Sequence, residues 1–107
     1  MKRDTRCALV MGDNISYCRQ KFPLEDYDIT PHAVIGALSK AKARDFAGGT
    51  AYVSRFPCPE CAKALAAAKF ARVIFKENNE VANTTLTSQI FTHFGIEVSQ
   101  NPDLELW

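Results

Sequence analysis

Two short segments near the amino terminus have the pattern of a β-hairpin. Residues 6–11 (RCALVM) are mostly apolar and end at the turn sequence Gly-Asp-Asn. Residues 15–21 (ISYCRQK) partly alternate between apolar and polar positions and end before Phe22. Short strand-like segments on either side of a tight turn predict an antiparallel pair of strands.

After this hairpin, segments with helical periodicity alternate with short apolar segments. Thr30 and Pro31 form a favourable helix start, since threonine is a good N-cap and proline is tolerated at the first helical position. The spacing of apolar residues predicts helices over 31–46, 59–69 and 84–94. Short apolar segments predict strands over 50–54, 71–75 and 96–99. The order ββ-α-β-α-β-α-β favours an α/β fold, and the helix between the last two strands predicts that they are parallel.

Length and charge limit the possible classes of protein. A chain of 107 residues with 47% hydrophobic residues is expected to form one domain over residues 1–107. The net charge of +1 gives no argument for binding to nucleic acid or to a membrane surface. No apolar segment approaches the ~20 residues that span a bilayer, and Asp13 interrupts the amino-terminal one. We therefore expect a cytoplasmic protein.

Three residues that commonly bind zinc lie at or near predicted helix starts. His32 follows Pro31, and Cys58 and Cys61 surround the start of the second predicted helix. The partial positive charge at a helix start lowers the pKa of a thiol and favours the thiolate. One imidazole and two thiolates form a typical set of zinc ligands, and three protein ligands with one open position are typical of a catalytic site.

Two other interpretations of the Cys-x-x-Cys sequence remain open. It is also the spacing of a thioredoxin-like redox pair, although the proline before Cys58 and the flanking residues are atypical of that motif. A structural zinc site would require a fourth ligand, for which Cys7, Cys18 or His93 is available. Otherwise Cys7 and Cys18 are expected to be small buried residues of the hairpin.

The segments PHAVIGAL and GGTAYVSRFPCPECAKALAAAKFARVIF resemble the cytidine and deoxycytidylate deaminase superfamily. The signature of that superfamily is His-x-Glu followed by Pro-Cys-x-x-Cys. The resemblance covers residues 6–100 and is closest to the deoxycytidylate deaminase branch. It implies a three-layer α-β-α fold around a five-stranded mixed sheet. The family usually has a further helix before the first strand, which this sequence does not contain.

The resemblance also implies roles for individual residues. His32, Cys58 and Cys61 would bind Zn²⁺, and a zinc-bound hydroxide would attack C4 of a cytosine nucleotide of the dCMP type. The backbone of Ala33 and the carbonyl of Phe56 match positions that contact the base. Arg55 precedes this turn and is a candidate ligand for a substrate phosphate, or else a surface arginine. The family is commonly oligomeric, so a homo-oligomer is expected, with a small nucleotide and not nucleic acid as the partner.

One position departs from the family signature. Val34 stands where the family has its catalytic glutamate, and valine cannot transfer a proton. Glu60 lies between the two cysteines and could replace this acid, but it is also explained as a helix-start residue. The loop before His32 contains three further acids, Glu25, Asp26 and Asp28. Three explanations of Val34 are open. The chain is a laboratory variant without its catalytic acid, a natural inactive relative, or an enzyme that acts on an unusual substrate by another route of proton transfer.

Two functions from different classes follow from Val34. The first is a zinc-dependent cytosine-nucleotide deaminase whose activity is crippled at this position. The second is a catalytically inactive protein of the deaminase fold that binds a nucleotide or a protein partner. A structural zinc domain used for interaction is a third, lesser interpretation.

Overall fold

The structure is a computed structural model that describes residues 3–22, 33–40, 43–78 and 84–105. Its five strands are β1 (Arg3–Met11), β2 (Asn14–Phe22), β3 (Thr50–Arg55), β4 (Arg72–Glu77) and β5 (Glu97–Gln100). Its helices are α1 (Ala33–Lys40), the short 3₁₀ helix η1 (Ala43–Phe46), α2 (Pro59–Ala67) and α3 (Thr84–His93). Each predicted helix and strand is present, although the first predicted helix is described as α1 and η1. None of the helices in these described ranges is long and apolar enough to cross a membrane.

The strands form one mixed sheet with the order β2-β1-β3-β4-β5. Strand β1 pairs antiparallel with β2 and β3, whereas β3, β4 and β5 are parallel to their neighbours. Gly12 has a positive φ of 59°, which glycine adopts without strain, in the tight turn between β1 and β2. The predicted hairpin and the predicted parallel pairing of the last two strands are therefore confirmed.

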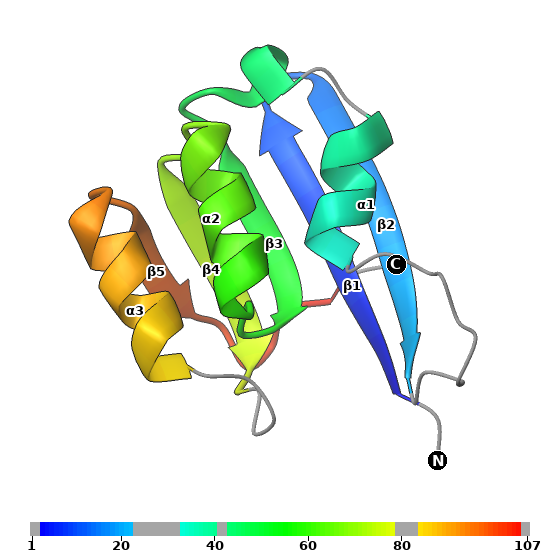
Figure 1. Cartoon of the computed structure of the whole chain (residues 1–107). Coiled ribbons are helices and arrows are strands. Elements are labelled where there is room, and N and C mark those ends of the chain that lie inside the picture. Colours follow the sequence, from blue (N-terminus) through cyan, green and yellow to red (C-terminus); the bar gives the residue numbers. More distant parts are fainter. Residues whose placement is uncertain (1–2, 23–32, 41–42, 79–83, 106–107) are drawn as a thin grey trace.

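All three α-helices lie on the same face of the sheet (Figure 1). Helix α2 packs against both α1 and α3, and α1 covers β1 and β2. Two right-handed connections that advance in the same direction, β3-α2-β4 and β4-α3-β5, place their helices on one face. The described helices therefore form one layer against the sheet, and the predicted α/β fold around a five-stranded mixed sheet is confirmed.

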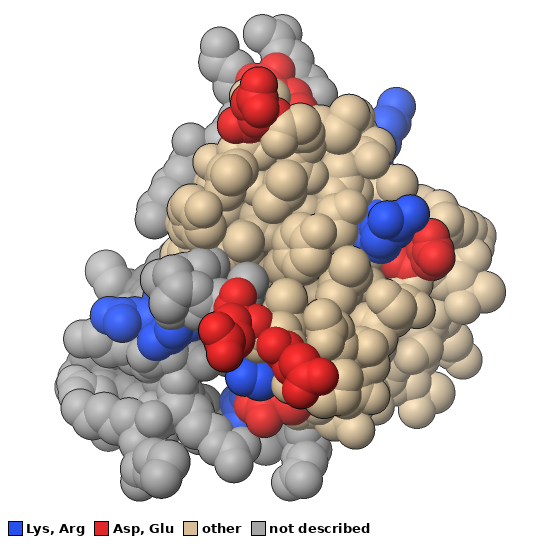
Figure 2. Space-filling model, turned by 180° about the vertical axis from the view of Figure 1, so that it is seen from behind, with Lys and Arg blue, Asp and Glu red and all other residues tan. Residues whose placement is uncertain are grey.

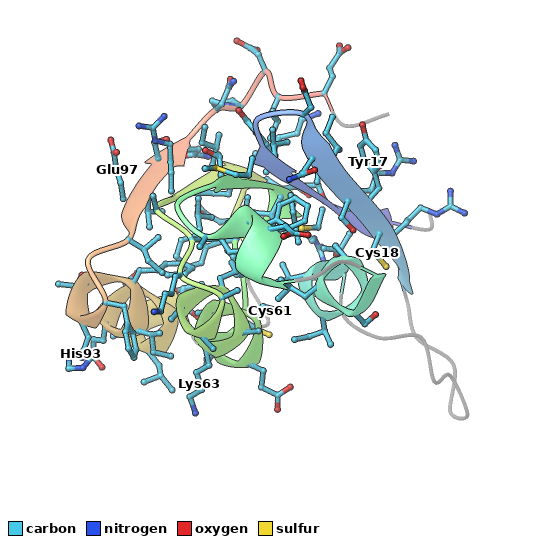
Figure 3. All side chains as sticks on the ribbon, turned by 90° about the horizontal axis from the view of Figure 1, so that it is seen from above. Tyr17, Cys18, Cys61, Lys63, His93 and Glu97 are labelled. Atoms are coloured by element: carbon cyan, nitrogen blue, oxygen red, sulfur yellow. The ribbon has the colours of Figure 1, made fainter. Side chains whose placement is uncertain are left out.

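The core lies between this helical layer and the sheet. Strand residues that alternate toward the helices are buried and directly paired, as Cys7 with Val53 and Leu9 with Ala51. On the opposite face, Ile15 and Tyr17 are 50% and 48% exposed. Figure 2 shows an area without charged side chains in the middle of this side, with acidic and basic side chains around it, and Figure 3 shows the segment after β5 running along this side. The main core therefore lies on the face of the sheet that the helices cover.

Candidate metal centre

The site is built at the carboxyl end of β3. The backbone N–H of Phe56 donates a 2.9 Å hydrogen bond to the carbonyl of Glu77, at the end of the neighbouring strand β4. The buried ring of Phe56 contacts Phe75 and Phe91 edge-on, with centroid distances of 4.9 and 6.2 Å. These contacts anchor the chain just before the Cys-x-x-Cys sequence.

Helix α2 begins directly after this anchor. Cys58 is its N-cap residue, with an extended backbone, and Pro59 occupies the first helical position. The backbone N–H of Ala62 donates to the carbonyl of Cys58 at 2.9 Å, which closes the first helical turn. Because Cys58 and Cys61 are one turn apart, both sulfurs lie at the helix N-terminus, where the helix dipole favours negative charge.

The two sulfur atoms approach each other to 3.3 Å, with Cys61 buried and Cys58 half-buried. Two thiolates on one tetrahedral zinc at ~2.3 Å lie ~3.8 Å apart. The sulfur–sulfur distance would therefore have to increase by only about half an ångström for both thiols to bind one zinc ion. The two sulfur donors, their Cys-x-x-Cys spacing and the partial exposure of Cys58 all fit a zinc ion.

The pKa of Cys61 is raised far above its ordinary value. The largest cause is its hydrogen bond with Cys58, followed by burial and by the charge that Cys58 would carry. Without a metal, Cys61 therefore retains its proton. Zinc binding must release it, because only the thiolate is a ligand.

The start of helix α1 lies beside the start of α2 at the proposed metal site. Figure 1 shows α1 and α2 next to each other and running in the same direction, so both helix starts lie at the carboxyl end of β3. Ala33 is the first residue of α1 and is buried. His32, the predicted third ligand, directly precedes it and lies outside the described residues.

Within the described ranges, no set of three His, Cys, Asp or Glu side chains is placed to hold a metal ion. The possible fourth ligands Cys7, Cys18 and His93 therefore do not join the Cys58–Cys61 pair in a described cluster. His93 is exposed at the far end of α3, with its ring against Phe94 at 4.9 Å. The described residues thus give no support to a structural site completed by one of these three.

Val34 lies in the first turn of α1 and is only 3% exposed. It belongs to the same buried cluster as Ala37 and Cys61. The position expected to carry a carboxylate thus holds an apolar side chain inside the core. Glu60, by contrast, is exposed in the first turn of α2.

Cys7 and Cys18 face each other across the β1–β2 pair and are both buried. Burial, and to a smaller degree the neighbouring Cys18, raises the pKa of Cys7 far above its ordinary value. These two cysteines have the packing role that the sequence predicted.

Arg55 lies at the end of β3 with its side chain only 12% exposed. Its Nε is 3.7 Å from a carboxylate oxygen of Glu77, at the end of β4. Its predicted contact with a substrate phosphate stays a prediction. Sequence reasoning missed Glu77 as its partner, because both residues lie just beyond the predicted ends of their strands, and their register is defined by the structure.

Comparison with known proteins is consistent with this arrangement. The family profile described as the cytidine and deoxycytidylate deaminase zinc-binding region matches residues 3–77. No curated protein matches the sequence.

Solved structures with a similar fold include a dCMP deaminase and a structure from studies of tRNA deaminases. The dCMP deaminase of cyanophage S-TIM5 in its apo form aligns with a TM-score of 0.67 and 17% identity, covering 91% of this chain and 79% of the other. Acinetobacter baumannii RibD aligns with a TM-score of 0.70 and 29% identity over 90% of this chain, which spans only 28% of RibD. A structure from studies of A-to-I editing by tRNA:A34 deaminases gives a TM-score of 0.65 and 21% identity, covering 91% and 82% of the two chains.

Proposed function

Because this chain belongs to the cytidine and deoxycytidylate deaminase family, we propose that His32, Cys58 and Cys61 hold a zinc ion beside a pocket for a cytosine nucleotide. We further propose that Val34 leaves the chain with little or no deaminase activity. The observation that carries this proposal is the pair of sulfurs 3.3 Å apart at the N-terminus of α2. Their position corresponds to the family's Pro-Cys-x-x-Cys sequence.

The zinc, when bound, would lower the pKa of a water molecule to about 7 and so supply the nucleophile for C4 of cytosine. Cys58 and Cys61 contribute to this site as thiolates, after release of the protons that they share in the metal-free protein. The N-termini of α1 and α2 add partial positive charge at the same end of the sheet. The carbonyl of Phe56, whose backbone is anchored to β4, would accept a hydrogen bond from the base.

Val34 removes the proton transfer from this scheme. Its side chain has no group that takes a proton from water or delivers one to the leaving ammonia. Loss of a positioned acid–base group typically costs ~10²–10⁴-fold in rate. Zinc binding and nucleotide binding do not require a carboxylate at position 34, so both are retained in this proposal.

A matched pair of substitutions tests the role of position 34. Val34→Glu, loaded with zinc, is expected to deaminate dCMP at least ~10²-fold faster than the unchanged chain, because burial raises a carboxyl pKa toward the range useful for acid–base catalysis. Val34→Gln, of similar size but unable to transfer a proton, is expected to show no gain. Assays on cytidine, dCTP and single-stranded DNA would define the substrate class. Equal activity of the Gln and Glu variants would contradict the proposal.

The buried apolar surroundings of Val34 favour a second candidate, a catalytically silent nucleotide-binding protein. In that case Val34→Glu gains no activity with any substrate, while calorimetry with dCMP still detects binding to the zinc-loaded chain. Absence of both activity and nucleotide binding would leave a zinc domain used for interaction.

The expected homo-oligomer forms part of the same proposal. Helix α3 carries no Asp, Glu, Lys or Arg, and Leu86 and Phe94 are exposed on and beside it. A surface depleted of charge with exposed apolar side chains is typical of the centre of a protein interface. Light scattering of the purified chain would show a mass above that of the 11.9 kDa monomer.

A further inference from the structure

We propose that the ion pair between Arg55 and Glu77 positions the zinc-binding turn, so that it sets the affinity of the site for zinc. This inference rests on the proposed function, because it concerns the same metal. Arg55 and Glu77 are both assigned a positioning role, and no sequence motif had indicated a role for Glu77. Neither residue is proposed to contact the metal.

The pair joins two strand ends at the edge of the sheet where the metal would bind. Arg55 and Glu77 are register partners in the parallel pair β3–β4, and each is the last residue of its strand. Figure 1 shows these two strands side by side, ending together at the start of α2. The 3.7 Å contact therefore links the two strand ends as they enter the site.

Only two residues separate Arg55 from the first thiol, and both are held. The N–H of Phe56 bonds to the carbonyl of the same Glu77 that pairs with Arg55, and the Phe56 ring lies between aromatic side chains of β4 and α3. Pro57 is buried and has a fixed φ. A shift of the strand end is therefore transmitted to Cys58 and is poorly absorbed by the intervening chain.

The burial of Arg55 makes this contact more than a surface ion pair. The arginine side chain is 12% exposed and that of its glutamate partner 51% exposed. A buried guanidinium loses much of its charge compensation when its carboxylate is removed, whereas exposed pairs break with little consequence. Removal of either member is thus expected to displace the end of β3.

The same sheet contains a matched control. Arg72 and Glu97 are also register partners on neighbouring parallel strands, and their Nε–Oε2 distance of 3.4 Å is even shorter. This second pair lies at the amino ends of β4 and β5, away from the thiols, with side chains 53% and 69% exposed. The two pairs have the same chemistry and differ in burial and in proximity to the proposed site.

Zinc affinity is the decisive measurement. Competition with a chromophoric chelator would compare the unchanged chain with Arg55→Gln, Glu77→Gln and Arg72→Gln. Each change at the first pair is expected to weaken zinc binding by about 10-fold or more, within the range for residues that support metal ligands. Arg72→Gln is expected to stay within about two-fold of the unchanged chain.

Two further variants separate positioning from general stability. The exchange Arg55→Glu with Glu77→Arg restores the pair in reverse and is expected to recover most of the affinity, while Arg55→Lys recovers part of it. The visible spectrum of the Co²⁺-loaded protein should change in the single variants and return in the exchanged one. Urea unfolding of the metal-free proteins would show that the Arg55→Gln and Arg72→Gln chains are both folded. If Arg55→Gln does not fold, Arg55→Lys and Glu77→Gln carry the same comparison.

Two results would overturn the inference. One is zinc affinity of Arg55→Gln and Glu77→Gln equal to that of the unchanged chain. The other is an equal loss of affinity in Arg72→Gln, which would indicate a general effect on stability. Failure of the unchanged chain to bind zinc would instead overturn the proposed function and this inference with it, and is recognised before any variant is made.

Discussion

The four cysteines of this protein form two pairs that differ in local backbone and in the exposure of one member. Cys7 and Cys18 lie opposite each other on β1 and the edge strand β2, and both are buried. Cys58 and Cys61 meet across one helical turn, at a helix N-terminus and with one member half-buried. The comparison shows that thiols close together do not by themselves form a metal site. The local backbone decides whether two thiols lie together at a helix start or face each other across a pair of strands.

Negative charge does not separate the two pairs in the metal-free protein, because the pKa of Cys61 is also raised, first by its hydrogen bond with Cys58 and then by burial. At the start of α2, unpaired backbone N–H groups and the helix dipole favour thiolates and so assist a metal that requires them. At Cys7, on β1, burial is the largest cause of the raised pKa and keeps that thiol neutral. Position at a helix N-terminus, and not the pKa of the metal-free thiols, thus suits Cys58 and Cys61 to ligation.

The largest expected difference between the pairs is in zinc binding. Cys61→Ser removes a thiolate from a site with three proposed ligands, so its affinity for zinc should fall by at least about 10²-fold. Cys18→Ser should bind zinc within about two-fold of the unchanged chain, because its side chain packs in the hairpin. Chelator competition would measure both, and an equal loss in the two variants would erase the proposed distinction.

The sequence was sufficient to predict most of the fold. Helical periodicity and the position of the helix between the last two strands gave the mixed sheet and its parallel pairs, because these features depend on local pattern and on short connections. The pairing of Cys58 with Cys61 also followed from spacing alone. The predicted α/β fold around a five-stranded mixed sheet is confirmed, whereas the placement of all three described helices on one face of the sheet came from the structure.

Other features could not be predicted because they depend on register. The pairing of Arg55 with Glu77 requires that β3 and β4 end at the same level, and strand ends are uncertain by several residues in a sequence pattern. Similarly, the depth of Val34 in the core depends on how α1 rotates against α2 and the sheet. The departure from the signature could be read from the sequence, but its burial could not.

The second prediction concerns the packing role of Cys7, which is fully buried. Cys7→Ser places a more polar group in an apolar cluster, and the free energy of unfolding should fall by about 1–3 kcal/mol. Cys7→Ala, which introduces no polar group but leaves a small cavity, should cost less. Urea unfolding of the metal-free proteins would compare them. A serine variant as stable as the alanine variant would show that this thiol position is not effectively apolar.

The third prediction uses the raised pKa of Cys7. Its folded pKa is above the unfolded value of ~8.5, so its contribution to stability is fully present below that pH and is lost as the pH rises toward the folded pKa. The free energy of unfolding should therefore decrease above about pH 8.5, by up to ~1.4 kcal/mol per pH unit for one thiol. The Cys7→Ala chain should show a shallower decrease in urea unfolding between about pH 7 and pH 9.5. Parallel curves for the two chains would contradict the assignment.

The smallest expected effect concerns the acid that lies between the metal-site thiols. Glu60 is exposed in the first turn of α2, where a carboxylate stabilises the helix by about 0.3–1 kcal/mol. Glu60→Gln should lose about that much stability and should leave zinc affinity nearly unchanged. Introduced together with Val34→Glu, it should also leave the gained deaminase activity within about two-fold, because a solvent-exposed carboxylate has no favoured path to the substrate. If Glu60→Gln instead abolishes that activity, Glu60 transfers the proton, and the thiol pair at the helix start would carry its own acid, unlike the pair in the sheet.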